Sequence, residues 1–191
     1  MFYELQHTVN ELDNVCFSGG AIGSDTIWGD IADKLGHQVI HWSFPDHKSK
    51  VETIELTQDL LNLADDYIRK ANKRIQREFP TKSLHTNNLL RRNYYQVLWT
   101  DSLYAVTNYH FLDEFEGGTA WAIQMFRDLH PKKHAYVFNP LVNKWITNQS
   151  TEWIETNDIP IPTGKWTGIG TRKLNKDIIP ELYQVAGLKY P

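Results

Sequence analysis

The sequence predicts a three-layer α/β fold around a mainly parallel central sheet. Short apolar runs alternate with amphipathic segments in the order strand, helix, strand, helix, helix, strand, helix, strand. Strands joined through helices run parallel, because the crossover returns the chain to the same end of the sheet. The chain has 191 residues, 41% of them hydrophobic, which is enough to bury the core of a single domain.

The first β-α-β unit follows this pattern closely. An apolar run predicts a buried strand at 14–18, and a second run predicts another at 38–44. Between them, apolar residues recur at helical spacing and predict a helix at 26–35, with Ser24 or Asp25 as its N-cap.

The same signals continue through the middle of the chain. Helical spacing predicts a long amphipathic helix at 51–77, another at 86–99, and a third that starts at Gly117-Gly118-Thr119 and runs to Leu129. The remaining elements expected in this part are strands at 102–107 and 134–138 and a loop at 108–116.

Residues 139–191 are expected to form an irregular C-terminal addition to the single domain. A short edge strand is expected at 144–147 and a terminal helix at 175–186. A glycine-containing turn at 167–172 precedes that helix. It is interpreted either as a flexible connection or as an extra phosphate clamp in which Arg172 supplies the charge.

Composition limits the classes of partner. The formal net charge of -3 provides no overall positive field for nucleic acids or anionic membranes. The single cysteine, Cys16, is expected to be a small buried hydrophobe in a cytoplasmic protein without a membrane span. The histidines form no ligand set, so neither a metal nor a cofactor is expected. Whether the chain forms a homo-oligomer stays open.

The segment Ser18-Gly19-Gly20-Ala21-Ile22-Gly23-Ser24-Asp25 joins the first strand to the first helix. Free loop amides and a helix start form an anion site, so the ligand-binding candidates here are Ser18, Gly19, Gly20, Ala21, Ser24 and Asp25. The segment matches neither the Walker motif nor the dinucleotide fingerprint. Read alone, it is equally explained as a tight turn.

Gly117, Gly118 and Thr119 form a second glycine loop between a strand and a helix start. The carboxyl ends of parallel strands meet at one edge of the sheet, where ligands of open α/β folds bind. Two helix starts converging there favour a ligand that carries phosphate. The sequence therefore predicts a small-molecule nucleotide or nucleotide-derived ligand, such as one resembling ADP-ribose.

Arg91 and Arg92 are the cationic candidates on the helix at 86–99, because a guanidinium group donates two parallel hydrogen bonds to phosphate. Helical spacing puts Arg91 at the border of the apolar stripe and Arg92 opposite it, which favours Arg91 as the residue that reaches a cleft. The alternative is a pair of exposed surface arginines.

These segments, from about 15 to 138, resemble the SLOG superfamily of Rossmann-like nucleotide-binding domains. That superfamily includes the Lonely Guy phosphoribohydrolases, molybdenum-cofactor carrier proteins and the domain of DNA-processing protein A. The resemblance rests on the two glycine loops and on an arginine helix that leads into Thr100-Asp101-Ser102-Leu103. It implies a Rossmann-like sandwich, and its spacing before Asp101 ranks Arg92 ahead of Arg91.

The phosphoribohydrolases carry a glutamate pair where this chain has Trp121-Ala122. Glu114 and Glu116 precede the glycines and are the carboxylates that could replace the pair. The alternative function is therefore a nucleotide N-glycosidic hydrolase, with Arg92 and Glu116 as catalytic residues. A third and weaker interpretation is a single-stranded DNA-binding protein, which the acidic balance disfavours.

Overall fold

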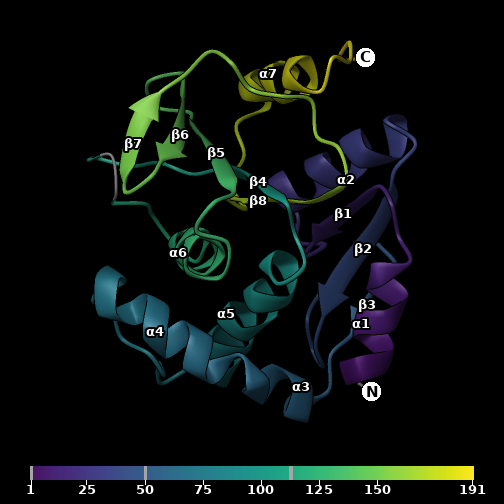
Figure 1. The fold of residues 1–191 in the computed structure, drawn as a ribbon, viewed down its shortest axis with the longest axis vertical. Helices are drawn as coiled ribbons and strands as arrows, with labels where there is room; N and C mark the ends of the chain where they lie inside the picture. Colours follow the sequence, from purple (N-terminus) through teal and green to yellow (C-terminus); the bar gives the residue numbers. More distant parts are fainter. Residues whose placement is uncertain (1, 50, 112–113) are drawn as a thin grey trace.

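The computed structural model describes residues 2–49, 51–111 and 114–191, and it is an α/β protein (Figure 1). Its strands form one eight-stranded, mostly parallel mixed sheet in the order β3-β2-β1-β8-β4-β5-β6-β7. The strands are β1 (Val15–Ser18), β2 (Gln38–Ser43), β3 (Ile54–Glu55), β4 (Ser102–Val106), β5 (His134–Asn139), β6 (Lys144–Gln149), β7 (Glu152–Glu155) and β8 (Lys165–Gly170).

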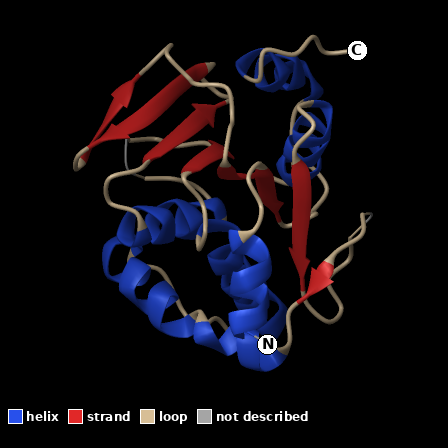
Figure 2. Cartoon of the chain, turned by 45° about the vertical axis from the view of Figure 1, so that its right-hand side comes forward, coloured by secondary structure: helices blue, strands red, loops and turns tan. Residues whose placement is uncertain are grey.

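The helices gather in two groups on either side of the strands (Figure 2). They are α1 (Phe2–Asn10), α2 (Ser24–Lys34), α3 (Gln58–Leu63), α4 (Asp65–Ile75), α5 (Leu84–Val97), α6 (Thr119–Leu129), the short 3-10 helix η1 (Lys176–Ile178) and α7 (Ile179–Val185). Within the described ranges, none of these helices combines the length and apolar character needed to cross a bilayer.

Alternate residues of the central strands pack into two hydrophobic clusters. In β4, Leu103 and Ala105 belong to the cluster that includes α5 and α6, whereas Tyr104 and Val106 belong to the cluster that includes α2 and α7. The period of two follows from the pleat, which points successive side chains to opposite faces. Cys16 is buried in the second cluster, as predicted. Both faces of the central strands are therefore buried.

The predicted helix at 51–77 is wrong in its first part. Residues Ile54–Glu55 instead form β3, which pairs with β2, and α3 begins only after Thr57. The Thr57 side chain accepts a hydrogen bond from the backbone amide of Leu60 and so caps α3. Ala64 then separates α3 from α4, so the amphipathic spacing continues across a break in the helix.

Residues 139–191 are not irregular, because they supply β6, β7 and β8. The predicted edge strand at 144–147 is part of β6, which pairs on both sides, and the edge is β7. The predicted turn at 167–172 lies largely in β8, which is central and parallel to β1 and β4. Gly168 is required there for packing, because a Cβ atom would lie 2.2 Å from the Cβ of Trp28.

The topology brings several loops to one edge of the sheet. The chain leaves β1 towards β2 on one side and later reaches β4 on the other, and β8 fills the position between β1 and β4. Because β1, β2, β4 and β8 run parallel, the segments that follow them emerge at the same edge. The expected loop at 108–116 is one of these segments, and its residues 112–113 lie outside the described ranges.

Candidate functional site

A cavity of about 830 Å³ opens at this carboxyl edge. Its walls come from the segments that follow β1, β2, β4 and β8, together with α5. The cavity lies where the strand order reverses direction between β1 and β4, which is the position at which open α/β sheets bind ligands. Both predicted glycine loops contribute to it, the first through Ala21, Ile22 and Asp25 and the second through Gly117, Gly118 and Thr119. The other candidates of the first loop do not line it: Ser18, Gly19, Gly20 and Ser24.

The first glycine loop is folded around the carboxyl group of Asp25. This residue is 2% exposed and lies in the first turn of α2, whose N-cap is Gly23, so the predicted caps Ser24 and Asp25 are wrong. Burial raises the pKa of Asp25, and the charge of Arg92 opposes that rise. Backbone hydrogen bonding by Gly170, Ala21 and Gly19 also opposes the rise of this pKa. The loop amides of Gly19 and Ala21 therefore already interact with the carboxyl group of Asp25.

The two serines of this loop hold the backbone. The Ser18 hydroxyl donates to the carbonyl of Asp25 at 3.1 Å and accepts from the amide of Gly20 at 3.2 Å. Gly20 has a φ of 62°, a conformation that glycine adopts without strain. The Ser24 hydroxyl donates to the carbonyl of Thr171 at 3.0 Å, which ties the loop to the end of β8.

Arg92 lines the cavity and is 5% exposed. Its Nη1 donates to the carbonyl of Gly19 at 2.6 Å, and its Nη2 lies 3.7 Å from Oδ2 of Asp25. The same Nη2 donates to Asn93 Oδ1 at 3.2 Å, and Asn93 Nδ2 donates to the carbonyl of Gly118 at 3.2 Å. This chain of contacts joins the two glycine loops through α5.

Arg91 does not line the cavity. Its Nε and Nη2 donate to the two carboxylate oxygens of Asp65 at 2.7 and 3.0 Å, which fixes α5 to α4. The prediction from helical spacing that Arg91 reaches the cleft is therefore wrong. The alternative of two exposed arginines is wrong as well, because both are buried. The physical reason is that α5 packs against α3, α4, α6 and the sheet, so its apolar stripe does not distinguish the side that faces the cavity.

The second glycine loop is more open than the first. Gly117 has a φ of 63° and is exposed, and a Cβ atom there would meet nothing within 4 Å. Gly118 is the N-cap of α6. Thr119 is buried, and its hydroxyl makes no hydrogen bond with the described part of the chain. Gly118 and Thr119 line the cavity at this helix start, where backbone amides favour an anion.

Further cations line the cavity, and most were not predicted. Arg172 is exposed, follows β8 and makes neither a hydrogen bond nor an ion pair with any described residue. Lys48 and Lys173 are also exposed lining residues. His47 Nε2 lies 3.4 Å from Arg92 Nη1. Burial and the charges of neighbouring cations lower the pKa of His47 to about 4.

The sequence contains one signal that points to these missed residues. Asp46, His47 and Lys48 follow the second strand of the β-α-β unit, and the carboxyl ends of parallel strands share an edge. That rule places their loop beside the first glycine loop. Asn93 and Thr171 carry no comparable signal, because their positions depend on contacts between distant segments.

The two candidate carboxylates occupy different places. Glu116 lines the cavity and is exposed, with its oxygens 2.9 Å from Asn108 Nδ2 and 3.1 Å from His110 Nε2. Glu114 lines a separate pocket instead. Trp121 is buried in the hydrophobic core. Glu116 is therefore the candidate carboxylate that lines this cavity.

Among the described residues, no three histidine, cysteine, aspartate or glutamate side chains are grouped so that they could hold a metal ion. Comparison with protein-family models, with curated proteins and with solved structures finds no significant match for the chain.

Proposed function

We propose that the cavity binds a phosphate-bearing nucleotide or nucleotide-derived ligand. One observation carries the proposal: two glycine loops and the guanidinium of Arg92, which are far apart in the sequence, line a single cavity at the reversal of strand order. Arg172, which pairs with no described residue, lies in the same wall. Guanidinium groups and the amides at a helix start both favour phosphate oxygens.

The lining also suits the rest of a nucleotide. Ile22, Leu89, Leu90 and Ile169 supply apolar surface beside the charged groups. Ligand sites typically combine such apolar walls with a few convergent polar groups. In this arrangement the phosphate lies near Arg172 and the second glycine loop, and the base or sugar lies on the apolar side chains.

The same proposal includes the SLOG resemblance and its fold. A Rossmann-like three-layer sandwich is supported by the burial of both faces of the central strands and by helices in both hydrophobic clusters. The insertion of β8 between β1 and β4 is an addition to the alternation of strands and helices that the sequence predicts. The chain then forms a single nucleotide-binding domain.

Calorimetric titration with AMP, ADP, NAD and ADP-ribose tests the proposal. We expect saturable binding of at least one of these nucleotides, weakened about tenfold by Arg172→Ala through the loss of a charged hydrogen bond. Lys132→Ala, which removes an exposed cation that does not line the cavity, is the matched control and leaves the affinity unchanged. Absence of saturable binding for all four ligands would overturn the proposal.

A second candidate function rests on the position of Glu116. An exposed carboxylate in the wall of a nucleotide cavity could assist cleavage of an N-glycosidic bond. Chromatography of nucleotides incubated with the protein would then detect free base, and Glu116→Gln would abolish its release. Glu114→Gln is the control, since Glu114 lies outside the cavity. Intact nucleotides after incubation with the wild-type protein would exclude hydrolysis of those substrates.

A further inference from the structure

We propose that a second cavity, of about 630 Å³, binds a small phosphate-bearing anion. It lies between the end of α4, the side of α6 and the turn at Thr151, and the segment at Glu114 and Phe115 forms part of its wall. It shares no lining residue with the first cavity. The inference is therefore independent of nucleotide binding.

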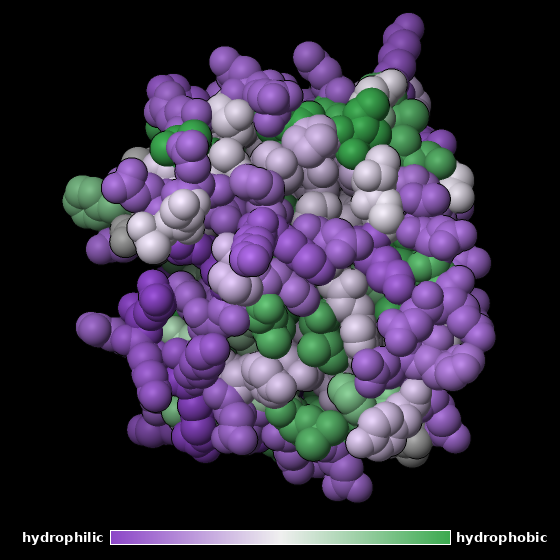
Figure 3. Space-filling view, in the orientation of Figure 1, coloured by the Kyte–Doolittle hydropathy of each residue, from purple (hydrophilic) through white to green (hydrophobic). Residues whose placement is uncertain are grey.

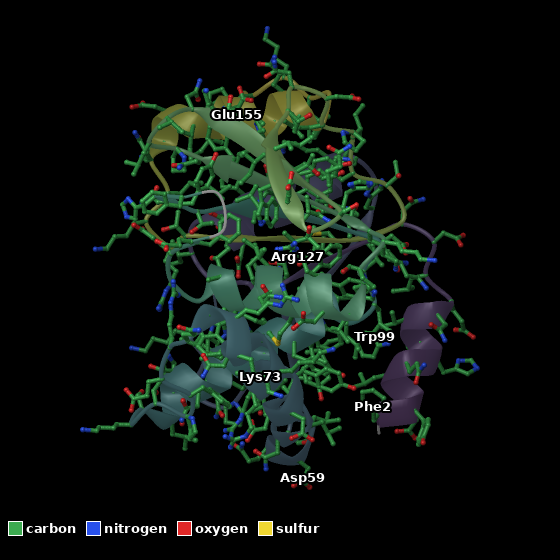
Figure 4. All side chains as sticks on the ribbon, turned by 60° about the vertical axis from the view of Figure 1, so that its left-hand side comes forward. Phe2, Asp59, Lys73, Trp99, Arg127 and Glu155 are labelled. Atoms are coloured by element: carbon green, nitrogen blue, oxygen red, sulfur yellow. The ribbon has the colours of Figure 1, made fainter. Side chains whose placement is uncertain are left out.

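The charge of this second cavity is strongly unbalanced. Lys73, Arg74, Arg77 and Arg127 line it, against the single carboxylate of Glu114. Figure 4 places Lys73 on α4 and Arg127 on α6 on the same side of the molecule. Figure 3 shows a strongly hydrophilic surface over α4 on that side. Four cations around one pocket attract an anion with more than one negative charge.

Two of the guanidinium groups are already fixed by the protein. Arg77 Nη1 donates to the carbonyl of Gly117 at 2.9 Å, and its Nη2 donates to the carbonyl of Phe115. Arg127 donates to the carbonyl of Thr151 at 3.0 Å and stacks over the ring of Trp153 at 5.1 Å. Groups held in this way lose little conformational freedom when they bind an anion.

Lys73 and Arg74 complete the site. Neither forms a hydrogen bond or an ion pair with any described residue. Their place in the last turn of α4 complements the helix dipole, which explains two cations at this end. The dipole of α4 does not explain the positions of Arg77, which lies beyond that helix, and Arg127, which belongs to α6. The convergence of cations from separate elements favours a ligand.

Phosphate fits this site better than a carboxylate side chain of another protein. The site is a pocket of small-molecule size, which favours a small anion over a side chain of another protein. Guanidinium groups bind phosphate through paired hydrogen bonds. Arg77 also holds the carbonyl of Gly117, and Gly117 lines the first cavity. Arg77 therefore connects the second cavity to the second glycine loop.

NMR titration of the amides with inorganic pyrophosphate tests this inference. We expect saturable shifts at Gln76 and Thr151, which line the second cavity. The double substitution Lys73→Ala with Arg74→Ala should weaken the dissociation constant read at these amides at least tenfold. Because both side chains are exposed, an unchanged melting temperature verifies that the variant is folded.

Controls separate this site from the first cavity. Arg172→Ala should leave the shifts at Gln76 and Thr151 intact, and so should a double substitution of exposed lysines elsewhere, Lys132→Ala with Lys189→Ala. Shifts confined to Gly170 and Thr171 would show pyrophosphate in the first cavity alone and would overturn the inference. Linear shifts without saturation would overturn it, and so would a hexaglutamate peptide that binds here when pyrophosphate does not.

Discussion

The two glycine loops have the same position relative to a strand and a helix, yet their polar groups have different partners. In the first loop the Gly19 carbonyl accepts from Arg92, the Ser18 hydroxyl binds the backbone, and the Asp25 carboxyl group takes loop amides. In the second loop Gly117 is exposed and the Thr119 hydroxyl has no hydrogen bond within the described ranges. Among the described residues, the first loop therefore holds Arg92 in place, whereas the second keeps the Thr119 hydroxyl available for a ligand.

The largest effect is expected from removal of the buried carboxylate. Asp25→Ala leaves the charge of Arg92 buried beside the carbonyl of Gly19 without its counter-ion. Loss of one partner of a buried ion pair costs about 3–5 kcal/mol of unfolding free energy. Urea denaturation measures this loss. Asp33→Ala, at an exposed residue of the same helix, should change it by less than about 0.5 kcal/mol. Equal effects would contradict a scaffolding role for the first loop.

Alanine at matched glycines compares the loops directly. A Cβ atom at Gly19 would lie 2.1 Å from Nη1 of Arg92, so Gly19→Ala must displace a buried, hydrogen-bonded group. We expect it to lower the free energy of unfolding by about 1–3 kcal/mol. A Cβ atom at Gly117 meets nothing within 4 Å, so Gly117→Ala costs only the strain of its positive φ, about 1 kcal/mol. A reversed order in urea denaturation would refute the comparison.

Acid should weaken the scaffold around the first loop through His47. The pKa of this residue is about 4 in the folded chain, below its ordinary value of 6.5. Between these two values the unfolded chain binds the proton and the folded chain does not, so stability falls as the pH falls from about 6.5 to about 4. Solvent screening reduces the size of this effect, because His47 is half-buried.

Urea denaturation at pH 7 and pH 5 isolates the contribution of His47. The loss of stability between the two pH values should be smaller in His47→Gln than in the wild-type protein. His7→Gln, at an exposed histidine of α1, should reproduce the wild-type loss. If His47→Gln loses as much stability as the wild-type protein, His47 is not the titrating group.

Sequence patterns predict those helices and strands whose residue spacing is visible within a short segment of the chain. The first β-α-β unit, the strand and helix that flank the second glycine loop, and β5 lie within a few residues of their predicted bounds. The position of β8 was not predictable, because its partners β1 and β4 are distant in the sequence. Gly168 packs against Trp28, and Gly170 packs against the carbonyl of Val106. In the sequence alone, these two glycines indicate a turn.

The candidate site, like the fold, was predicted only where its residues form a local pattern in the sequence. Glycine loops between strands and helices are local signals, and the structure brings both to one cavity. The choice between Arg91 and Arg92 depends on which side of α5 faces that cavity. Helical spacing could not decide this, because both side chains are nearly buried. The spacing in the SLOG resemblance, which itself stays a prediction, ranked Arg92 first, and Arg92 is the arginine that lines the cavity.

The smallest effect on stability is expected at the open loop. Thr119→Val keeps the shape of the side chain and removes a hydroxyl that bonds to no described residue, so the free energy of unfolding should change by less than about 0.5 kcal/mol. Ser18→Ala, which leaves the amide of Gly20 unpaired, should cost about 1–3 kcal/mol. These stabilities are again measured in urea.

Nucleotide affinity should show the opposite order. Thr119→Val should weaken binding about tenfold, as expected for one hydrogen bond to a charged group, because Thr119 lines the cavity and its hydroxyl bonds to no described residue. Ser18 does not line the cavity, so Ser18→Ala should bind with wild-type affinity wherever it is folded. Calorimetry on both variants decides the matter. An affinity loss at Ser18 without one at Thr119 would mean that the first loop, and not the second, contacts the phosphate.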